Sequence, residues 1–321
     1  TVASNAGAQF EEGAAAYSRG DYAAALGKFR PLADQGDPRA QSILGFMHYA
    51  GRGLTQNYAL AAKWYRLAAE QGDSTAQYNL GTVHKEGQGV SRNDEEAAKW
   101  YRRAAEQGSA RAQVGLGVAY HRGQGVSANS DEAAKWFRLA AAQGAADAQY
   151  RLGTLYTEGL GVPKDSAQAA TLFGLAAEQG HPLAQNDLGS LYDDGEGVEQ
   201  DYRKASRYFR RAAEKGLAEA QNNLGVLYEF GRGVQANDAE AAAWYRKAAG
   251  QGDPHGQFAL GNLHRAGRGV PPDLIQAYLW FDLAATRGHE SAAENRDLIA
   301  DQMTPAQIDE AKNLALAWVP D

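Results

Sequence analysis

The residues of this chain that could do chemistry are seven glycine pairs and seven histidines. A Gly-x-Gly pair cradles phosphate when it follows a strand and opens a helix. Here the pairs recur from Gly51/Gly53 to Gly267/Gly269, each after a helical pattern. None has the further glycine, three residues later, of a dinucleotide-binding loop. The pattern therefore favours structural loops over a phosphate site.

The histidines invite a metal site, because imidazole is a common metal ligand. His48 and His84 stand 36 residues apart in equivalent positions and could approach each other. No carboxylate pattern completes a site, and the chain has no cysteine. His-Glu-x-x-His, Gly-x-Ser-x-Gly and Ser-x-x-Lys motifs do not occur either. The sequence thus predicts no enzyme, no catalytic residue, no cofactor and no metal site.

The charge balance limits the classes of partner. The formal net charge is −7, whereas phosphate binding requires a basic face. No apolar run approaches the roughly 20 residues that cross a bilayer. We therefore expect no nucleic acid and no membrane insertion, and an acidic surface that suits a basic partner.

The elements that carry these residues form a repeat of 36 residues without insertions. Glycine ends each unit, and a Leu-Gly pair recurs once per unit. Glycine closes units at Gly36, Gly72, Gly108, Gly144, Gly180, Gly216, Gly252 and Gly288. The Leu-Gly pairs begin at Leu44, Leu80, Leu116, Leu152, Leu188, Leu224 and Leu260. A period of this length indicates a solenoid of stacked supersecondary units.

Each unit reads as helix, short loop, helix and tight turn. In the third repeat, Ala112, Leu116 and Tyr120 lie four apart on one face of the first helix. The glycine of the Leu-Gly pair leaves room for a neighbouring helix. Asn129 belongs to a column that contains only Asn or Asp, which are strong N-caps. Such a unit cannot bury its apolar face alone, so stacked units must share one core.

The second helix contains columns that never vary. Ala133 and Ala140 are alanine in all seven repeats, which indicates that two helices cross too closely for a larger side chain. Gly144 then ends the second helix in a left-handed conformation. Near residue 304 a last helix is expected to begin, with Thr304 as its N-cap, Pro305 at the first helical position and Gln307 completing a capping box. We expect Ile308, Leu314 and Trp318 to close the core there.

The columns resemble the Sel-one-like repeat (SLR), a 36-residue relative of the tetratricopeptide repeat (TPR). The pattern A-x-x-x-L-G-x-x-Y-x-x-G-x-G-V, followed by [N/D]-x-x-x-A-x-x-W-[YF]-x-x-A-A-x-x-G, carries the resemblance. It implies an all-α fold, a right-handed α-solenoid superhelix of helix-turn-helix repeats. The expected organisation is an N-terminal TPR-like capping unit at 1–36, seven 36-residue repeats at 37–288, and C-terminal capping helices at 289–321.

The resemblance also implies a non-catalytic scaffold or adaptor that binds a protein or peptide in its concave groove, and we expect it to act as a monomer. Two alternatives stay open, a cell-wall or carbohydrate binder and a hydrolase of the β-lactamase-like type. The closing Thr304–Ile308 segment resembles bacterial exported members, which favours the periplasm or secretion, with the cytoplasm as the alternative.

Partner-binding residues are expected where the first helices vary from unit to unit. A packing position repeats its residue because each unit solves the same problem, whereas a recognition position meets a different part of the partner. The resemblance places the first helices on the concave face, with their inward positions two before, two after, five after and six after the leucine of each Leu-Gly pair. The candidates are Tyr49, Tyr78, Lys85, His121, Arg122, Tyr150, Glu158, Asn186, Asp193, Asp194, Asn222, Glu229, Phe230, Phe258 and Arg265.

Within this set we expect two local features. One is an acidic stretch that attracts a basic segment, with Arg151 nearly alone against it: Asp147, Glu158, Asp187, Asp193, Asp194, Glu219 and Glu229. The other is a set of exposed aromatic anchors: Tyr49, Tyr78, Tyr150, Phe230 and Phe258. Asn186 and Asn222 are expected to clamp an extended peptide backbone.

Overall fold

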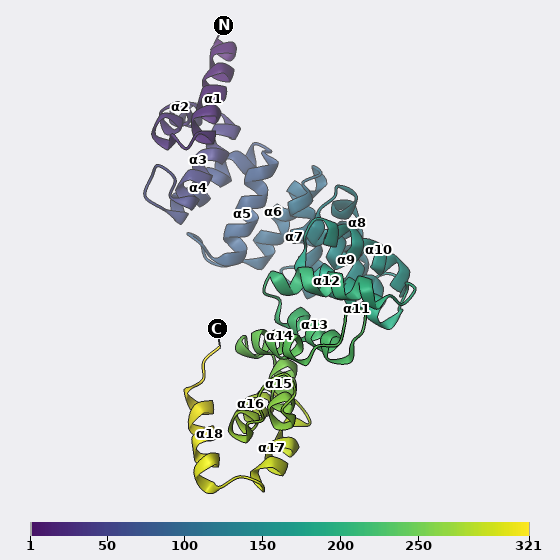
Figure 1. Cartoon of the computed structure of the whole chain (residues 1–321). Coiled ribbons are helices and arrows are strands. Elements are labelled where there is room, and N and C mark those ends of the chain that lie inside the picture. Colours follow the sequence, from purple (N-terminus) through teal and green to yellow (C-terminus); the bar gives the residue numbers. More distant parts are fainter. Residues whose placement is uncertain (1, 321) are drawn as a thin grey trace. The chain divides into compact units, whose positions relative to one another are not determined.

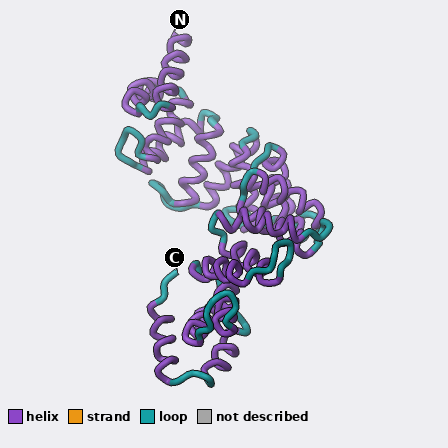
Figure 2. The backbone as a smooth tube through the Cα atoms, in the orientation of Figure 1, coloured by secondary structure: helices purple, strands orange, loops and turns teal. Residues whose placement is uncertain are grey.

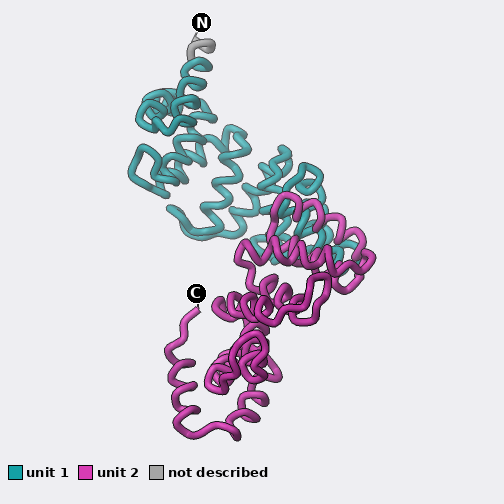
Figure 3. The backbone as a smooth tube through the Cα atoms, in the orientation of Figure 1, with its two compact units in different colours: residues 1–164 teal, residues 165–321 magenta. Residues whose placement is uncertain are grey.

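The computed structural model describes residues 2–320, and over those residues it contains eighteen α-helices joined by loops, with no strand (Figures 1 and 2). The chain divides into two compact units, residues 1–164 and residues 165–321 (Figure 3). Within each unit, helices that are consecutive in the chain pack against each other, except that α17 and α18 both pack against α16. The predicted all-α fold of tandem helix pairs is confirmed.

The helices have nearly constant length, because the caps recur at the same place in every repeat. The N-terminal unit contains α1 Val2–Ser18, α2 Tyr22–Asp34, α3 Pro38–Ala50, α4 Tyr58–Glu70, α5 Ser74–Glu86, α6 Asp94–Glu106, α7 Ala110–Arg122, α8 Ser130–Ala142 and α9 Ala146–Glu158. The C-terminal unit contains α10 Ser166–Glu178, α11 Pro182–Asp194, α12 Tyr202–Glu214, α13 Ala218–Phe230, α14 Asp238–Gly250, α15 Pro254–Ala266, α16 Leu274–Thr286, α17 Ala292–Ala300 and α18 Pro305–Ala317. We call α3, α5, α7, α9, α11, α13 and α15 the first helices and α4, α6, α8, α10, α12, α14 and α16 the second helices.

Polar caps set the start of each second helix. Asn129 Oδ1 accepts a hydrogen bond from the backbone N–H of Glu132 at 3.1 Å, and the equivalent Asn or Asp does the same in the other six repeats. The side-chain oxygen satisfies one of the backbone donors that a helix leaves unpaired at its N-terminus. The N-cap column predicted from the sequence is therefore confirmed.

The glycine pairs shape the loop between the two helices of a repeat. Gly123 ends α7 with φ of 66°, in the left-handed region that glycine adopts without strain. Gly125 has φ of 69°, and a Cβ atom there would lie 1.9 Å from the carbonyl oxygen of Asp94, in the first turn of α6. The second glycine thus lets the loop rest on the preceding second helix. Packing accounts for both glycines.

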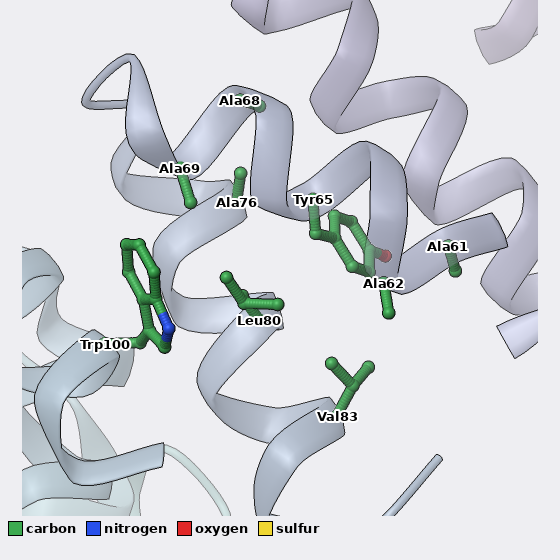
Figure 4. Close-up of a cluster of buried hydrophobic side chains, with 9 residues drawn as sticks. All are labelled: Ala61, Ala62, Tyr65, Ala68, Ala69, Ala76, Leu80, Val83 and Trp100. Atoms are coloured by element: carbon green, nitrogen blue, oxygen red, sulfur yellow. The ribbon is translucent and has the colours of Figure 1, made fainter. Parts of the chain in front are cut away.

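The core of a repeat lies between its two helices and the second helix of the preceding repeat. In one cluster Tyr65 of α4 and Leu80 of α5 are at most 1% exposed, and Trp100 of α6 packs against them (Figure 4). The alanine columns that include Ala133 and Ala140 are at most 3% exposed in all seven repeats. Small residues at these crossings allow the backbones to approach closely, as the sequence predicts.

A buried glutamine joins each first helix to the helix before it. In the third repeat Gln113 is 4% exposed, and its Nε2 donates to the carbonyl oxygen of Ala105 in α6 at 3.2 Å. The same bond recurs in all seven repeats, at 3.0 to 3.4 Å. In four repeats the side-chain oxygen accepts from a second glutamine at the end of the second helix, such as Gln143 Nε2 at 2.8 Å. We call these residues the glutamine column.

Two repeats lack the second glutamine, and there the column is incomplete. Lys215 occupies its place in the fifth repeat and bonds to Gly180 instead, while Arg287 occupies it in the seventh and donates to the Leu283 carbonyl. The side-chain oxygens of Gln185 and Gln257 are correspondingly buried without a hydrogen-bond partner.

The C-terminal end closes the core with partly different residues from those expected. The capping box of Thr304 and Gln307 is present, and Ile308 packs against the last cluster. Leu314 is 40% exposed, so its predicted role in the core is wrong. Ala311, fully buried three residues earlier on α18, faces the core instead. Trp318 is half-buried beside Arg287 rather than within that cluster.

The Leu-Gly glycine gives a stability test. A Cβ at position 117 would lie 2.5 Å from Cε1 of Phe137, so we expect Gly117→Ala to destabilise the fold by about 1–3 kcal/mol through overpacking. Gly27→Ala is the matched control, because Gly27 is also within a helix but has no atom within 4 Å of the new methyl group. That control should be neutral or stabilising by up to about 1 kcal/mol. Urea unfolding of both variants measures the difference, and equal midpoints would show that Gly117 is not needed for close packing.

Candidate functional site

Three pockets lie on the same side of the first helices. Their lining residues on the first helices fall mainly five before, two before, one before, two after, five after and six after the leucine of a Leu-Gly pair. These positions lie on one face of an α-helix, and we call them the first-helix face. The sequence predicts the face at two before, two after, five after and six after the leucine. All four positions line pockets: Ser42 and Tyr150 lie two before the leucine, and Asp194 lies six after it.

The sequence prediction therefore missed two columns of this face. The position one before the leucine includes Arg151 and Asn223, and the position five before includes Thr75 and Arg111; all four line pockets. Both columns vary between repeats as much as the predicted ones do. That variation was the available signal, but it does not say on which side of the helix the neighbouring repeat packs.

In the N-terminal unit, two pockets open on this face. The N-terminal pocket has a volume of about 310 Å³ and is lined by residues of α1, α2, α3, α5 and α7: Ala14, Tyr17, Ser18, Phe29, Ser42, Ile43, Phe46, Thr75, Asn79 and Arg111. The middle pocket, of about 180 Å³, is lined by His121, Phe137, Tyr150, Arg151, Thr154 and Leu155. The structure thus brings together two predicted residues, His121 and Tyr150.

The third pocket lies in the C-terminal unit and is acidic. It has a volume of about 190 Å³ and is lined by Ser190, Asp193, Asp194, Phe209, Asn223, Val226 and Leu227. The Oδ1 atom of Asp193 is buried and has no hydrogen-bond partner. Burial raises the pKa of this carboxyl, and Arg232 opposes the shift with its Nη1 at 4.0 Å from Oδ2. We call these residues the acidic pocket.

Arginines from the loops correct the expectation that Arg151 stands nearly alone against the acidic stretch. Arg232 and Arg268 occupy the middle position of Gly-x-Gly pairs. Each pairs with a carboxylate on the first helix of the preceding repeat, Asp193 and Glu229 respectively. Arg268 Nη1 lies 2.9 Å from Glu229 Oε1, and Tyr245 donates its hydroxyl proton to the other oxygen of Glu229 at 2.7 Å. Glu229 is therefore largely committed within the chain, whereas Asp194 is exposed.

Asn186 is also committed. It is 1% exposed, its Oδ1 accepts from Asn223 Nδ2 at 3.2 Å, and its Nδ2 donates to Asp187 at 3.2 Å. Burial contradicts the expectation that Asn186 clamps a peptide backbone. Asn222 is half-buried, and nothing in the structure tests its role.

Four of the five aromatic residues expected to be exposed are half-buried. Phe258 stacks on His289, with ring centroids 4.1 Å apart, and Tyr78 packs beside Tyr101. Tyr49 and Tyr150 are likewise half-buried. Phe230 is 61% exposed and matches the prediction. The remaining predicted residues, Lys85, His121, Arg122, Glu158 and Arg265, are exposed.

Three histidines of the first helices, His48, His84 and His264, lie beside arginines. His48 and His84 are buried, and His264 is half-buried. The neighbouring arginines are Arg30, Arg66 and Arg246 respectively. Arg66 Nη2 lies 3.4 Å from Nε2 of His84, where the equivalent arginine in another repeat, Arg210, donates to Tyr228 at 2.5 Å. Burial, and then the nearby arginine charge, lowers the pKa of His48 and of His84. Among residues 2–320, no three metal-ligating side chains come together.

These histidines make stability depend on pH. Unfolded histidine binds a proton below about pH 6.5, whereas the lowered pKa values of His48, His84 and His264 keep the folded side chains neutral. Their contribution to stability is therefore present above about pH 6.5 and is lost as the pH falls through that value. We expect the urea midpoint to drop between about pH 7 and about pH 5.5.

A His48→Tyr/His84→Tyr/His264→Tyr variant should lose less stability over the same pH range, because tyrosine serves beside arginine in other repeats. His121→Tyr, at an exposed position, is the control and should keep the parental slope. An unchanged slope in the triple variant would assign the pH dependence to other groups.

Comparison with known proteins adds the following. The family model described as "Sel1 repeat" matches residues 38–73, 74–109, 110–144, 146–181, 182–217, 218–253 and 254–289. A Sel1 repeat protein from Oxalobacter formigenes is 33% identical, with a TM-score of 0.68 over 76% of this chain and 96% of the other. A protective antigen of uropathogenic Escherichia coli with an SLR fold is 31% identical, with a TM-score of 0.52 over 98% of this chain and 84% of the other. No curated protein sequence matches the chain. Of the described helices, none is long and apolar enough to cross a membrane.

Proposed function

The chain belongs to the Sel1 repeat family, and we propose that it is a non-catalytic adaptor that binds a protein or peptide along its first-helix face. Sel1 repeat proteins generally mediate protein–protein interaction. The pockets on this face support the proposal, because their lining changes from repeat to repeat while the packing columns stay constant.

In the C-terminal unit the partner would supply a lysine or arginine side chain to the acidic pocket. The observation that carries this step is the buried Oδ1 of Asp193, which has no hydrogen-bond partner. A buried acceptor without a partner costs about 1–3 kcal/mol, and a cationic donor removes that cost. Ser190 and Asn223 add polar atoms to the same pocket, and Asp194 adds a second carboxylate.

The proposal also covers the oligomeric state and the location of the protein. One chain suffices for binding, because each pocket is built within one unit of a single chain, so we propose a monomer. The closing helix resembles exported members, and the two similar structures come from bacteria. We therefore propose a bacterial protein of the periplasm or of the secreted fraction.

Neutralising the acidic pocket tests the proposal. The probe is a fluorescein-labelled peptide of alternating glycine and lysine, titrated by fluorescence polarisation. Asp193→Asn/Asp194→Asn should weaken binding about tenfold, or about 1.4 kcal/mol, because two charge-assisted contacts are lost. Glu229 is left in place because it holds Tyr245 and Arg268.

The control is Glu178→Gln/Glu214→Gln, which removes the same charge from exposed positions on second helices of this unit. Equal loss in both variants would mean that net charge rather than the pocket binds the peptide. Unchanged affinity in the Asp193→Asn/Asp194→Asn variant would show that the acidic pocket is not part of the binding surface.

A further inference from the structure

The first-helix face of α3, α5 and α7 carries the opposite charge from that of α11 and α13. On α3, α5 and α7 one acidic side chain, Glu86, stands against four basic ones: Arg39, Lys85, Arg111 and Arg122. On α11 and α13 the face carries only acidic residues: Asp187, Asp193, Asp194, Glu219 and Glu229. The basic part was not expected, because the predicted columns omitted Arg39 and Arg111.

Most of these basic groups are available to a partner. Lys85, Arg111 and Arg122 form no ion pair with any residue that the structure describes, whereas Arg39 pairs with Asp37 at 3.2 Å. On the second helices of the same unit, lysines pair with their own neighbours, as Lys99 does with Glu96. Lys85, Arg111 and Arg122 are therefore cations of this face without an internal counter-charge among the described residues.

An apolar hollow lies among these cations. Tyr17, Ile43 and Phe46 line the N-terminal pocket of about 310 Å³, and Phe46 is 37% exposed there. The pocket is large enough for a large apolar side chain. Arg111 lines the same pocket from α7.

A second guanidinium group stands over the same rings. Arg52, from the first Gly-x-Gly loop, donates to the Tyr17 hydroxyl at 2.8 Å, and its guanidinium carbon lies 5.4 Å from the Phe46 ring centroid. No carboxylate of a described residue pairs with Arg52. The rings therefore meet one guanidinium group from the loop and another, Arg111, among the pocket-lining residues.

We propose that the N-terminal pocket binds a large apolar side chain of an acidic peptide segment, whose carboxylates meet Arg52 and Arg111. This inference rests on the proposed function of the first-helix face. Guanidinium groups form strong charge-assisted bonds with carboxylates, and the apolar side chain buries its surface against Phe46 and Tyr17. Single-stranded nucleic acid is disfavoured, because it requires cations that follow a backbone with bases stacked between them, whereas here two guanidinium groups, Arg52 and Arg111, stand beside one apolar hollow.

Peptide binding to paired variants tests the inference. The probe is a fluorescein-labelled peptide of alternating glycine and glutamate with one central phenylalanine. Phe46→Ala should weaken its binding at least fivefold, whereas Leu67→Ala should not, although both side chains are 37% exposed and Leu67 lies on the second helix α4. Arg111→Gln should weaken it similarly, and the control Arg138→Gln, exposed on α8, should not. Thermal melts followed by circular dichroism confirm that each variant folds.

Three results would overturn the inference. Equal affinity for a peptide with serine in place of phenylalanine would remove the apolar anchor, and equal loss in the control variants would remove the pocket. Displacement of the peptide by a single-stranded oligonucleotide would point to nucleic acid instead. If the lysine peptide binds the acidic pocket and the acidic peptide binds nowhere, this inference fails while the proposed function stands. If neither peptide binds, both fail.

Discussion

A buried hydrogen bond from a glutamine side chain to the helix before it holds the repeats in register. The last turn of every α-helix leaves carbonyl groups without a partner inside the helix, and the turn glycine satisfies one of them here, as the backbone N–H of Gly108 does for Ala105 at 3.0 Å. In each repeat a buried glutamine of the next first helix donates to that same carbonyl, as Gln113 does to Ala105, and so pairs its own amide. Because an unpaired buried polar group is costly, this bond fixes both the depth and the rotation at which the next helix sits. The alanine columns and the Leu-Gly glycines then fill the space that this register defines.

Register also decides which side chains reach the partner-facing side, and this explains how far the sequence could predict the structure. The period, the Asn and Asp caps and the glycine helix ends follow from local rules, and all are confirmed. Successive positions on a helix differ by about 100°, so an error of one residue moves a side chain from solvent to core. Asn186 was placed on the open side and is buried, while Asn223, at the neighbouring position of the next repeat, lines the pocket. Variation between repeats identifies a helix surface without giving its orientation.

Contacts over long separations in the chain were the other limit. Glu229 appears in the sequence as one of several free carboxylates, yet Arg268 pairs with it from a position 39 residues later. Tyr245 adds a hydroxyl from the following helix. Neither contact belongs to the pattern of a single repeat, because both depend on which residue happens to occupy a variable loop or helix position. The charge of the first-helix face is consequently set by pairs of repeats.

The fixed separations within the glutamine column have a consequence for how such a chain changes in length. Every hydrogen bond from glutamine to carbonyl spans 8 residues, and the four hydrogen bonds between glutamines each span 30. Recombination that removes or duplicates one whole 36-residue segment joins each glutamine to an equivalent partner and leaves no buried amide unpaired. Selection can therefore add, lose or reorder repeats as units, each bringing its own portion of the binding surface. Lys215 and Arg287 mark the repeats whose side-chain oxygen has already lost its partner, so a crossover there carries an unsatisfied acceptor into its new setting. Those two boundaries restrict which rearrangements remain stable.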